Sequence, residues 1–383
     1  MEQKNRIIIS GGGTGGHIYP AISIADALKK ADPECEILFV GALGKMEMEK
    51  VPAAGYRIEG LPVAGLKRKL TLSNLAIPFK VIKSLRKASQ IIRRFRPDAV
   101  VGVGGYASAP MLKKAQSLGI PTIVQEQNSY AGLTNKIVGQ KAEKVCVAYE
   151  GMEKFFPADR IILTGNPIRD NIRQYGAKEK AEGREFFRMD PALPAILVVG
   201  GSGGCGTFNR IMENLCRNTG GKLPYQILWQ SGKGYAGAVS ALFRETGGDT
   251  DKDGFRRLGN ICNCDFLTRM DHAFACADIV VSRAGAGTIS ELCAIGKATI
   301  FVPSPNVAED HQTHNAMALV HKDAAIMIAD SHADTELVPA IEKLISSPEE
   351  ITSLEKNIFR LARPDASAEI AGIVLKTIEM KRK

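Results

Sequence analysis

The chain has 383 residues, a net charge of +9, and 45% hydrophobic and 24% charged residues, an ordinary composition for a globular protein. A chain of this length exceeds what one hydrophobic core usually organises, so two domains are expected. The apolar run at residues 7–9 is too short for a signal peptide, and the absence of an apolar run of about 18 residues predicts no membrane-spanning helix.

Short apolar runs alternate with helical patterns along the whole chain and predict buried parallel strands. In the first half they are residues 6–10, 36–41, 98–105, 121–126 and 144–149. After a charged, helix-like stretch at 176–191 they resume at 195–201, 225–232, 266–270, 278–285, 298–303 and 324–329. The pattern predicts an α/β fold of two Rossmann-like domains facing across a cleft. Their expected bounds are 1–166 and 167–363, with an amphipathic helix at 364–383 packing back on the first domain.

Glycine-rich loops follow the predicted strands at 11–16, 102–105, 200–206 and 284–287. Open α/β sheets bind ligands at the carboxyl ends of their strands, and a loop that opens a helix there presents N–H groups to an anion. Gly11, Gly13 and Gly16 match the G-x-G-x-x-G spacing of NAD and FAD sites. Neither half has the acidic residue that such a site uses at the end of its second strand, which disfavours an oxidoreductase.

A sugar nucleotide needs a different set of groups. Main-chain amides of the glycine loops suit a diphosphate, and Glu291 suits a ribose. The polar side chains available for a hexose are Asn128, Ser202, Gln312 and Asn315. Arg283, just before the last loop, either pairs with a phosphate or braces the loop.

Cysteine and histidine spacings give little support for a metal site. Cys262 and Cys264 form the only close pair among eight cysteines, so reduced cytosolic thiols are expected. His311 and His314 lie three residues apart without a carboxylate ligand set beyond Glu309 and Asp310. The sequence therefore predicts no metal and no cofactor.

Eight motifs together resemble the MurG family of peptidoglycan N-acetylglucosaminyltransferases. They occur in the family's order between residue 6 and about residue 320, and they are GGGTGGHIYPA (11–21), GKMEMEKVPAAGY (44–56), GVGGYASAP (102–110), QEQNSYAGLTNK (125–136), GNPIR (165–169), GGSGGCGTFN (200–209), SRAGAGTISEL (282–292) and EDHQTHNA (309–316). Gln125 departs from the family, which is expected to carry His before Glu-Gln-Asn.

The resemblance implies a GT-B fold and an inverting transfer of N-acetylglucosamine (GlcNAc) from UDP-GlcNAc to a muramyl-pentapeptide pyrophosphoryl-undecaprenol lipid. The C-terminal domain would hold the donor, with Leu267 contacting uracil through its backbone. The residues implied in donor binding are Thr14, Gly15, Gly16, Asn128, Arg169, Ser202, Leu267, Ala286, Gly287, Thr288, Ile289, Ser290, Glu291 and Gln312. Loops of the N-terminal domain, with Gly104, Gly105 and Tyr106, would face the acceptor.

Inverting transfer needs a base for the acceptor hydroxyl and positive potential for the departing diphosphate. His17 is the leading candidate base, because imidazole titrates near neutral pH. Its alternative role is to cap or pack the loop. Glu126 competes with it as base or acceptor contact, although a carboxylate at such a strand end can instead be a structural ion-pair partner.

Residues 61–97 hold ten Lys and Arg and no Asp or Glu. Ile82, Leu85, Ala88, Ile92 and Phe95 form a predicted helical core stripe. Basic and apolar side chains outside it suit an anionic membrane surface, and the expected contacts are Lys67, Arg68, Lys69 and Phe79. A solvated helix face is the alternative, and no nucleic-acid motif accompanies the charge.

These inferences predict a peripheral protein at the cytoplasmic face of the bacterial inner membrane, with cell-wall synthesis proteins as possible partners. Two alternatives share the expected fold. One is a diacylglycerol glycosyltransferase, and the other is a UDP-GlcNAc 2-epimerase, which needs no lipid.

Overall fold

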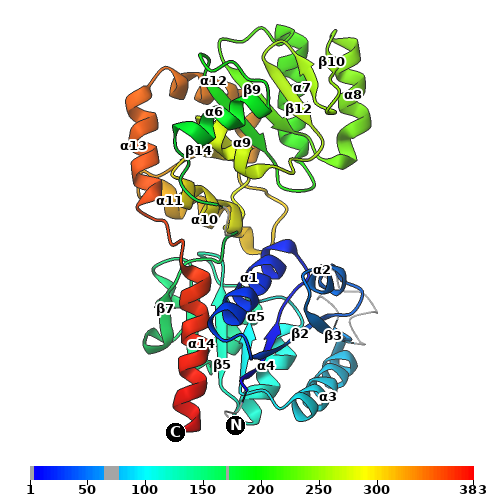
Figure 1. The fold of residues 1–383 in the computed structure, drawn as a ribbon, viewed down its shortest axis with the longest axis vertical. Coiled ribbons are helices and arrows are strands. Elements are labelled where there is room, and N and C mark those ends of the chain that lie inside the picture. The colour runs from blue at the N-terminus through cyan, green and yellow to red at the C-terminus, as the bar shows by residue number, and fades with distance from the viewer. Residues whose placement is uncertain (1–3, 64–76, 170–171) are drawn as a thin grey trace. The chain divides into compact units, whose positions relative to one another are not determined.

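The computed structural model describes residues 4–63, 77–169 and 172–383. The chain divides into an N-terminal unit, Met1–Arg169 with Arg363–Lys383, and a C-terminal unit, Asp170–Ala362. Each unit is built on its own, largely parallel sheet with helices around it, which confirms the predicted pair of α/β domains (Figure 1). In the part of the chain that the structure describes, no helix is long and apolar enough to cross a bilayer.

The N-terminal unit contains a seven-stranded parallel sheet with the order β3-β2-β1-β4-β5-β6-β7. The strands are β1 (Arg6–Ser10), β2 (Glu36–Ala42), β3 (Arg57–Leu61), β4 (Ala99–Gly102), β5 (Thr122–Glu126), β6 (Lys144–Val147) and β7 (Ile161–Leu163). The helices are α1 (Gly15–Ala31), α2 (Glu47–Ala53), α3 (Ile77–Phe95), α4 (Ser108–Ser117), α5 (Leu133–Gly139) and α14 (Ala366–Arg382). The strand order reverses direction between β1 and β4, and this switch point lies between the first two glycine loops.

The C-terminal helix α14 belongs to the N-terminal unit and lies beside α1 (Figure 1). Ile370, Val374 and Ile378 of α14 share one buried cluster with Ile18 and Ile24 of α1. Two ion pairs add to this packing, Lys381 with Glu143 at 2.8 Å and Arg382 with Asp98 at 2.9 Å. Apolar burial therefore holds the chain end on this unit.

Helix α3 buries a different stripe from the predicted one. Ala88, Ile92 and Phe95 are buried as expected, but Ile82 is 48% exposed, so its assignment to the core was wrong. Ser84 takes the inward position in this turn, and its hydroxyl donates to the carbonyl of Pro62 at 3.2 Å. A polar side chain with a main-chain partner thus replaces the expected apolar contact.

The C-terminal unit contains an eight-stranded sheet with the order β10-β11-β12-β9-β8-β13-β14-β15. The strands are β8 (Ala195–Val199), β9 (Gln226–Gln230), β10 (Asp249–Thr250), β11 (Arg256–Leu258), β12 (Ile261–Cys264), β13 (Ile279–Ser282), β14 (Ala298–Phe301) and β15 (Ile326–Met327). The helices are α6 (Ala177–Phe186), α7 (Gly206–Thr219), α8 (Ala236–Glu245), α9 (Met270–Cys276), α10 (Ala286–Ile295), α11 (His311–Val320), α12 (Ala333–Ile345) and α13 (Pro348–Phe359). Strand β11 pairs antiparallel with β10 and with β12. The strand order reverses direction between β8 and β13, and this is the switch point of the sheet.

The predicted strand at 266–270 was wrong, because the sheet instead uses β12 just before it. Asn263 in β12 is fully buried, donates to the carbonyl of Trp229 at 3.1 Å and accepts from Arg256 at 2.8 Å. Paired in this way, a polar side chain is tolerated inside the sheet. Phe266 is 43% exposed, so the apolar residue that suggested a strand lies at the surface.

Candidate active site

The loop at residues 11–16 joins the carboxyl end of β1 to α1. Gly12 and Gly13 have φ angles of 140° and 92°, which residues with a Cβ rarely adopt. Thr14 is the N-cap residue of α1, and Gly15 and Gly16 are its first two residues. The loop therefore presents main-chain N–H groups at a helix N-terminus, an arrangement that favours an anion.

A second loop follows β4 and packs directly on the first. Gly104 and Gly105 have positive φ angles, and a Cβ at Gly105 would lie 2.2 Å from the carbonyl oxygen of Gly12. A Cβ at Gly104 would lie 2.9 Å from the imidazole of His17. Tyr106 comes next and is 51% exposed. The residues predicted to face the acceptor are thus next to the candidate base.

Glu47 is a site-supporting residue that the sequence analysis missed. Its carboxylate is buried and accepts from the N–H of Gly13 at 2.9 Å and from the N–H of Ala42 at 2.8 Å. A Cβ at Gly12 would lie 2.3 Å from this carboxyl group, so the loop fits closely around it. Glu47 belongs to the quoted motif at 44–56, but its role depends on contacts that the motif does not reveal.

His17 lies in the first turn of α1 and is partly buried. Its Nδ1 is 3.2 Å from the hydroxyl oxygen of Thr14. When Nδ1 carries the proton and donates to Thr14, Nε2 is the basic nitrogen, and Nε2 is on the side of the ring that faces Gly104. The geometry is therefore compatible with a base oriented by Thr14.

Glu126 ends β5 and is 1% exposed. One carboxylate oxygen accepts from the main-chain N–H and the side-chain amide of Asn128, at 3.0 and 3.2 Å. The other accepts from the N–H of Gly132 at 3.1 Å and from Asn135 at 2.9 Å. Burial raises the pKa of Glu126, and these hydrogen bonds oppose the rise. Glu126 holds the loop that carries Asn128.

Gln125 lies in β5, and Arg169 ends the first segment of the N-terminal unit. Gln125 is buried, and its amide donates to Asn166 at 2.9 Å, which links β5 to the chain before Arg169. Arg169 is exposed.

The predicted membrane contacts Lys67, Arg68 and Lys69 lie outside the described residues, as does the side chain of Phe79.

A cavity of about 360 Å³ lies at the carboxyl ends of β8 and β13 in the C-terminal unit. Gly206, the first residue of α7, and Gly285, the N-cap of α10, both line it. Two helix N-termini therefore converge on one cavity, and the main-chain N–H groups of a first helical turn favour a diphosphate.

Several predicted donor residues lie in or around this cavity. Thr288 and Gln312 line it, and Gln312 also accepts from the N–H of Ser304 at 2.8 Å. Ser202 is exposed on the glycine loop. The first two turns of α10 contain the remaining predicted residues Ala286, Gly287, Ile289, Ser290 and Glu291. Ile289 is buried in the core, so only its backbone is available to a ligand.

Gln230 is the second residue that the sequence analysis missed. Its side-chain amide donates to the carbonyl of Gly201 at 2.7 Å and accepts from the N–H of Leu267 at 3.2 Å. It thus joins the glycine loop to the segment expected to contact uracil. Because the N–H of Leu267 is used in this way, a base contact through this backbone would use its carbonyl.

Arg283 braces the last glycine loop, which is one of the two roles left open for it. Its guanidinium donates to the carbonyls of Val302 and Pro303, each at 2.9 Å, and pairs with Asp330 at 2.6 Å. The side chain also lines the cavity, so its charge contributes positive potential there.

The eight cysteines are all buried free thiols. Across residues 4–63, 77–169 and 172–383, no group of three or more His, Cys, Asp or Glu is arranged to hold a metal ion.

Family models match both units of the chain. The glycosyltransferase family 28 N-terminal domain matches residues 7–147, and the corresponding C-terminal domain matches residues 195–370. The chain is 52% identical over 380 residues to a protein of Parabacteroides distasonis named UDP-N-acetylglucosamine--N-acetylmuramyl-(pentapeptide) pyrophosphoryl-undecaprenol N-acetylglucosamine transferase, covering 99% of this chain and 100% of the relative. A protein of the same name from Phocaeicola vulgatus is 50% identical over 384 residues, with coverages of 100% and 99%.

One solved structure supports the same assignment, and a second shares the fold. The crystal structure of Acinetobacter baumannii MurG matches with a TM-score of 0.78 and 26% identity, over 97% of this chain and 99% of that chain. A UDP-GlcNAc 2-epimerase from Neisseria meningitidis matches with a TM-score of 0.64 and 14% identity, over 98% and 100%, a likeness of fold alone. The chain therefore belongs to glycosyltransferase family 28 and, within it, to the MurG group of N-acetylglucosamine transferases.

Proposed function

We propose that this protein transfers GlcNAc from UDP-GlcNAc to the muramyl-pentapeptide pyrophosphoryl-undecaprenol lipid, converting lipid I into lipid II. The observation that carries the proposal is the convergence of the N-termini of α7 and α10 on one cavity at a switch point. Relatives at about 50% identity over the whole chain, named for this transfer, support the choice of substrates.

The donor would bind with its diphosphate at these two N-termini and its uracil near Leu267. Glu291 is proposed to bind the ribose, and Gln312 the sugar. As the bond from the anomeric carbon to the diphosphate breaks, negative charge grows on the departing UDP. The N–H groups of α7 and α10 and the guanidinium of Arg283 would stabilise that charge. These groups are already in position before the reaction begins.

The acceptor hydroxyl would attack the anomeric carbon from the face opposite the diphosphate, which inverts the configuration there. His17 Nε2 is proposed to take the hydroxyl proton, while Thr14 fixes the imidazole through Nδ1. The loops at 11–16 and 102–105 would receive the acceptor pyrophosphate through their main-chain N–H groups. Glu47 holds the first of these loops in position.

Glu126 fits a positioning role better than the role of base. Both its oxygens already accept hydrogen bonds, from its own loop and from Asn135 of α5, and it is enclosed by protein. A base must instead reach the substrate proton directly or through one water. We therefore propose that Glu126 orders the loop of Asn128 and that His17 performs the proton transfer.

The exposed side of α3 supports a proposed contact with an anionic membrane surface at the cytoplasmic face of the inner membrane. Val81 and Ile82 are each 48% exposed, next to exposed Lys83 and Arg86. Such a combination lets apolar groups enter the lipid boundary while cations meet phosphates. Lys67, Arg68, Lys69 and Phe79 are proposed to contact the same membrane.

The proposed reaction is tested by incubating the protein with labelled UDP-GlcNAc and a soluble lipid I analogue. The expected result is a labelled disaccharide lipid and one UDP per transfer, measured by chromatography. Transfer to diacylglycerol but not to the analogue would contradict the acceptor. Conversion of UDP-GlcNAc without any acceptor would instead favour an epimerase.

His17→Ala is expected to lower kcat by about 10²–10⁴-fold, the usual contribution of a general base. The Kd for UDP should stay unchanged, because the proposed diphosphate contacts belong to the C-terminal unit. His332→Ala is the matched control, since His332 is an exposed histidine of that unit with no proposed role. A parallel fall in kcat, UDP affinity and Tm would show that His17 only supports the loop.

Membrane association is tested by sedimentation with liposomes. Binding to vesicles that contain anionic lipid should fall as salt rises, because screening weakens charge attraction. Ile82→Ser together with Lys83→Gln should reduce binding severalfold. Equal binding to neutral vesicles would refute the electrostatic contact.

A further inference from the structure

A second, larger cavity lies in the C-terminal unit, at the opposite ends of the strands from the candidate donor site. Its volume is about 820 Å³. It borders the amino ends of three parallel strands, because Pro194 precedes β8, Asp278 precedes β13 and Lys297 precedes β14. The glycine loops follow the carboxyl ends of β8 and β13, so the two cavities are separate.

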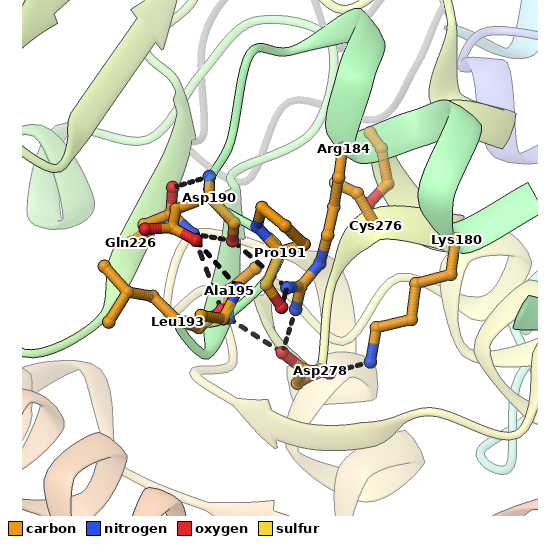
Figure 2. A network of polar contacts seen from close by, with 11 residues as sticks. Lys180, Arg184, Asp190, Pro191, Leu193, Ala195, Gln226, Cys276 and Asp278 are labelled. Carbon is orange, nitrogen blue, oxygen red and sulfur yellow. Dashed lines mark hydrogen bonds and ion pairs between the residues drawn. The ribbon is translucent and has the colours of Figure 1, made fainter.

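Two of the three cations that line this cavity share one carboxylate. Lys180 and Arg184 lie one turn apart on α6 and pair with Asp278 at 2.5 and 2.9 Å (Figure 2). The same carboxylate accepts from the N–H of Ala195 at 2.8 Å. Asp278 therefore gives each of these two cations an ion-pair partner and ties α6 to the sheet, and Arg184 also donates to the carbonyls of Asp190 and Pro191.

Lys297 is the third cation, and it differs from the other two. In the described part of the chain, its side-chain ammonium has no hydrogen bond or ion pair within 4.0 Å, and the same holds for the carboxylate of Glu355, which also lines the cavity. Burial lowers the pKa of Lys297, and the charges of Glu355 and Asp278 only partly oppose this effect. An ammonium group in such surroundings would gain from a hydrogen-bonded anion.

The lining also contains apolar side chains beside its polar and charged groups. Leu193 and Ile295 line the cavity, together with Ile345 of α12 and Ile351 of α13. A volume of this size is within the range of about 300–1,000 Å³ seen for small-molecule sites. Such sites combine apolar side chains with a few polar groups that orient the ligand.

We propose that this cavity binds a small organic anion, whose carboxylate or phosphate group contacts Lys297 and whose apolar part packs on Leu193, Ile345 and Ile351. The three cations and the two carboxylates leave one positive charge in the lining, which one anionic group neutralises. Asp278 lines the site and holds α6 against the sheet there. The site is independent of the donor cavity and of the proposed transfer reaction.

The test is isothermal titration calorimetry with phenyl phosphate and with benzoate, in the presence of saturating UDP. At least one probe should bind saturably, and phenol, which has the same ring without the charge, should not. The stronger probe identifies whether the site prefers phosphate or carboxylate. Lys297→Gln should weaken binding at least about tenfold, as expected for loss of a charge-assisted hydrogen bond.

Three further variants make the result specific. Lys297→Arg keeps the charge and should retain binding, while Glu355→Gln should tighten it because a carboxylate facing the anion is removed. Lys222→Gln changes an exposed lysine outside the cavity and should have no effect. Unchanged affinity in Lys297→Gln, or no saturable binding of either anion at about 10 mM, would overturn the proposal. Failure of UDP to bind would count against the donor site alone.

Discussion

Close backbone contact between glycine loops is the constraint on which the candidate site depends. In the C-terminal unit, a Cβ at Gly204 would lie 1.9 Å from the carbonyl oxygen of Ser231, and a Cβ at Gly232 would lie 2.3 Å from that of Gly203. Only glycine allows the loops after β8 and β9 to approach this closely. The same device joins Gly12 and Gly105 in the N-terminal unit. In both units the contact fixes the start of a helix at the switch point of the sheet.

Much of the fold could be predicted because buried parallel strands leave a local signal. Runs such as 6–10 and 195–201 are continuous and apolar, and the structure has strands in both. The signal failed where long-range pairing compensates a polar residue. Asn263 fits in a strand because Arg256 and the carbonyl of Trp229 satisfy the hydrogen bonds of its side chain. Ser84 takes the core position expected for Ile82 because the carbonyl of Pro62 accepts a hydrogen bond from its hydroxyl.

The candidate site was predictable where its chemistry is local and hidden where it depends on distant partners. Glycine loops and helix starts are visible in the sequence, and Thr288 and Gln312 do line the cavity. Glu47 and Gln230 were missed because each acts on a loop about 30 residues away, through a main-chain group that any residue possesses. Arg283 stayed ambiguous for the same reason, since its partners are carbonyls after β14 and Asp330.

The central claim is that the N-termini of α7 and α10 hold the diphosphate of the donor. It is tested most directly by titrating UDP into ¹⁵N-labelled protein and following the amide resonances. The largest shifts are predicted at Gly206, Gly285 and Thr288. Shifts confined to the loop at 11–16, with no change at these amides, would contradict the claim.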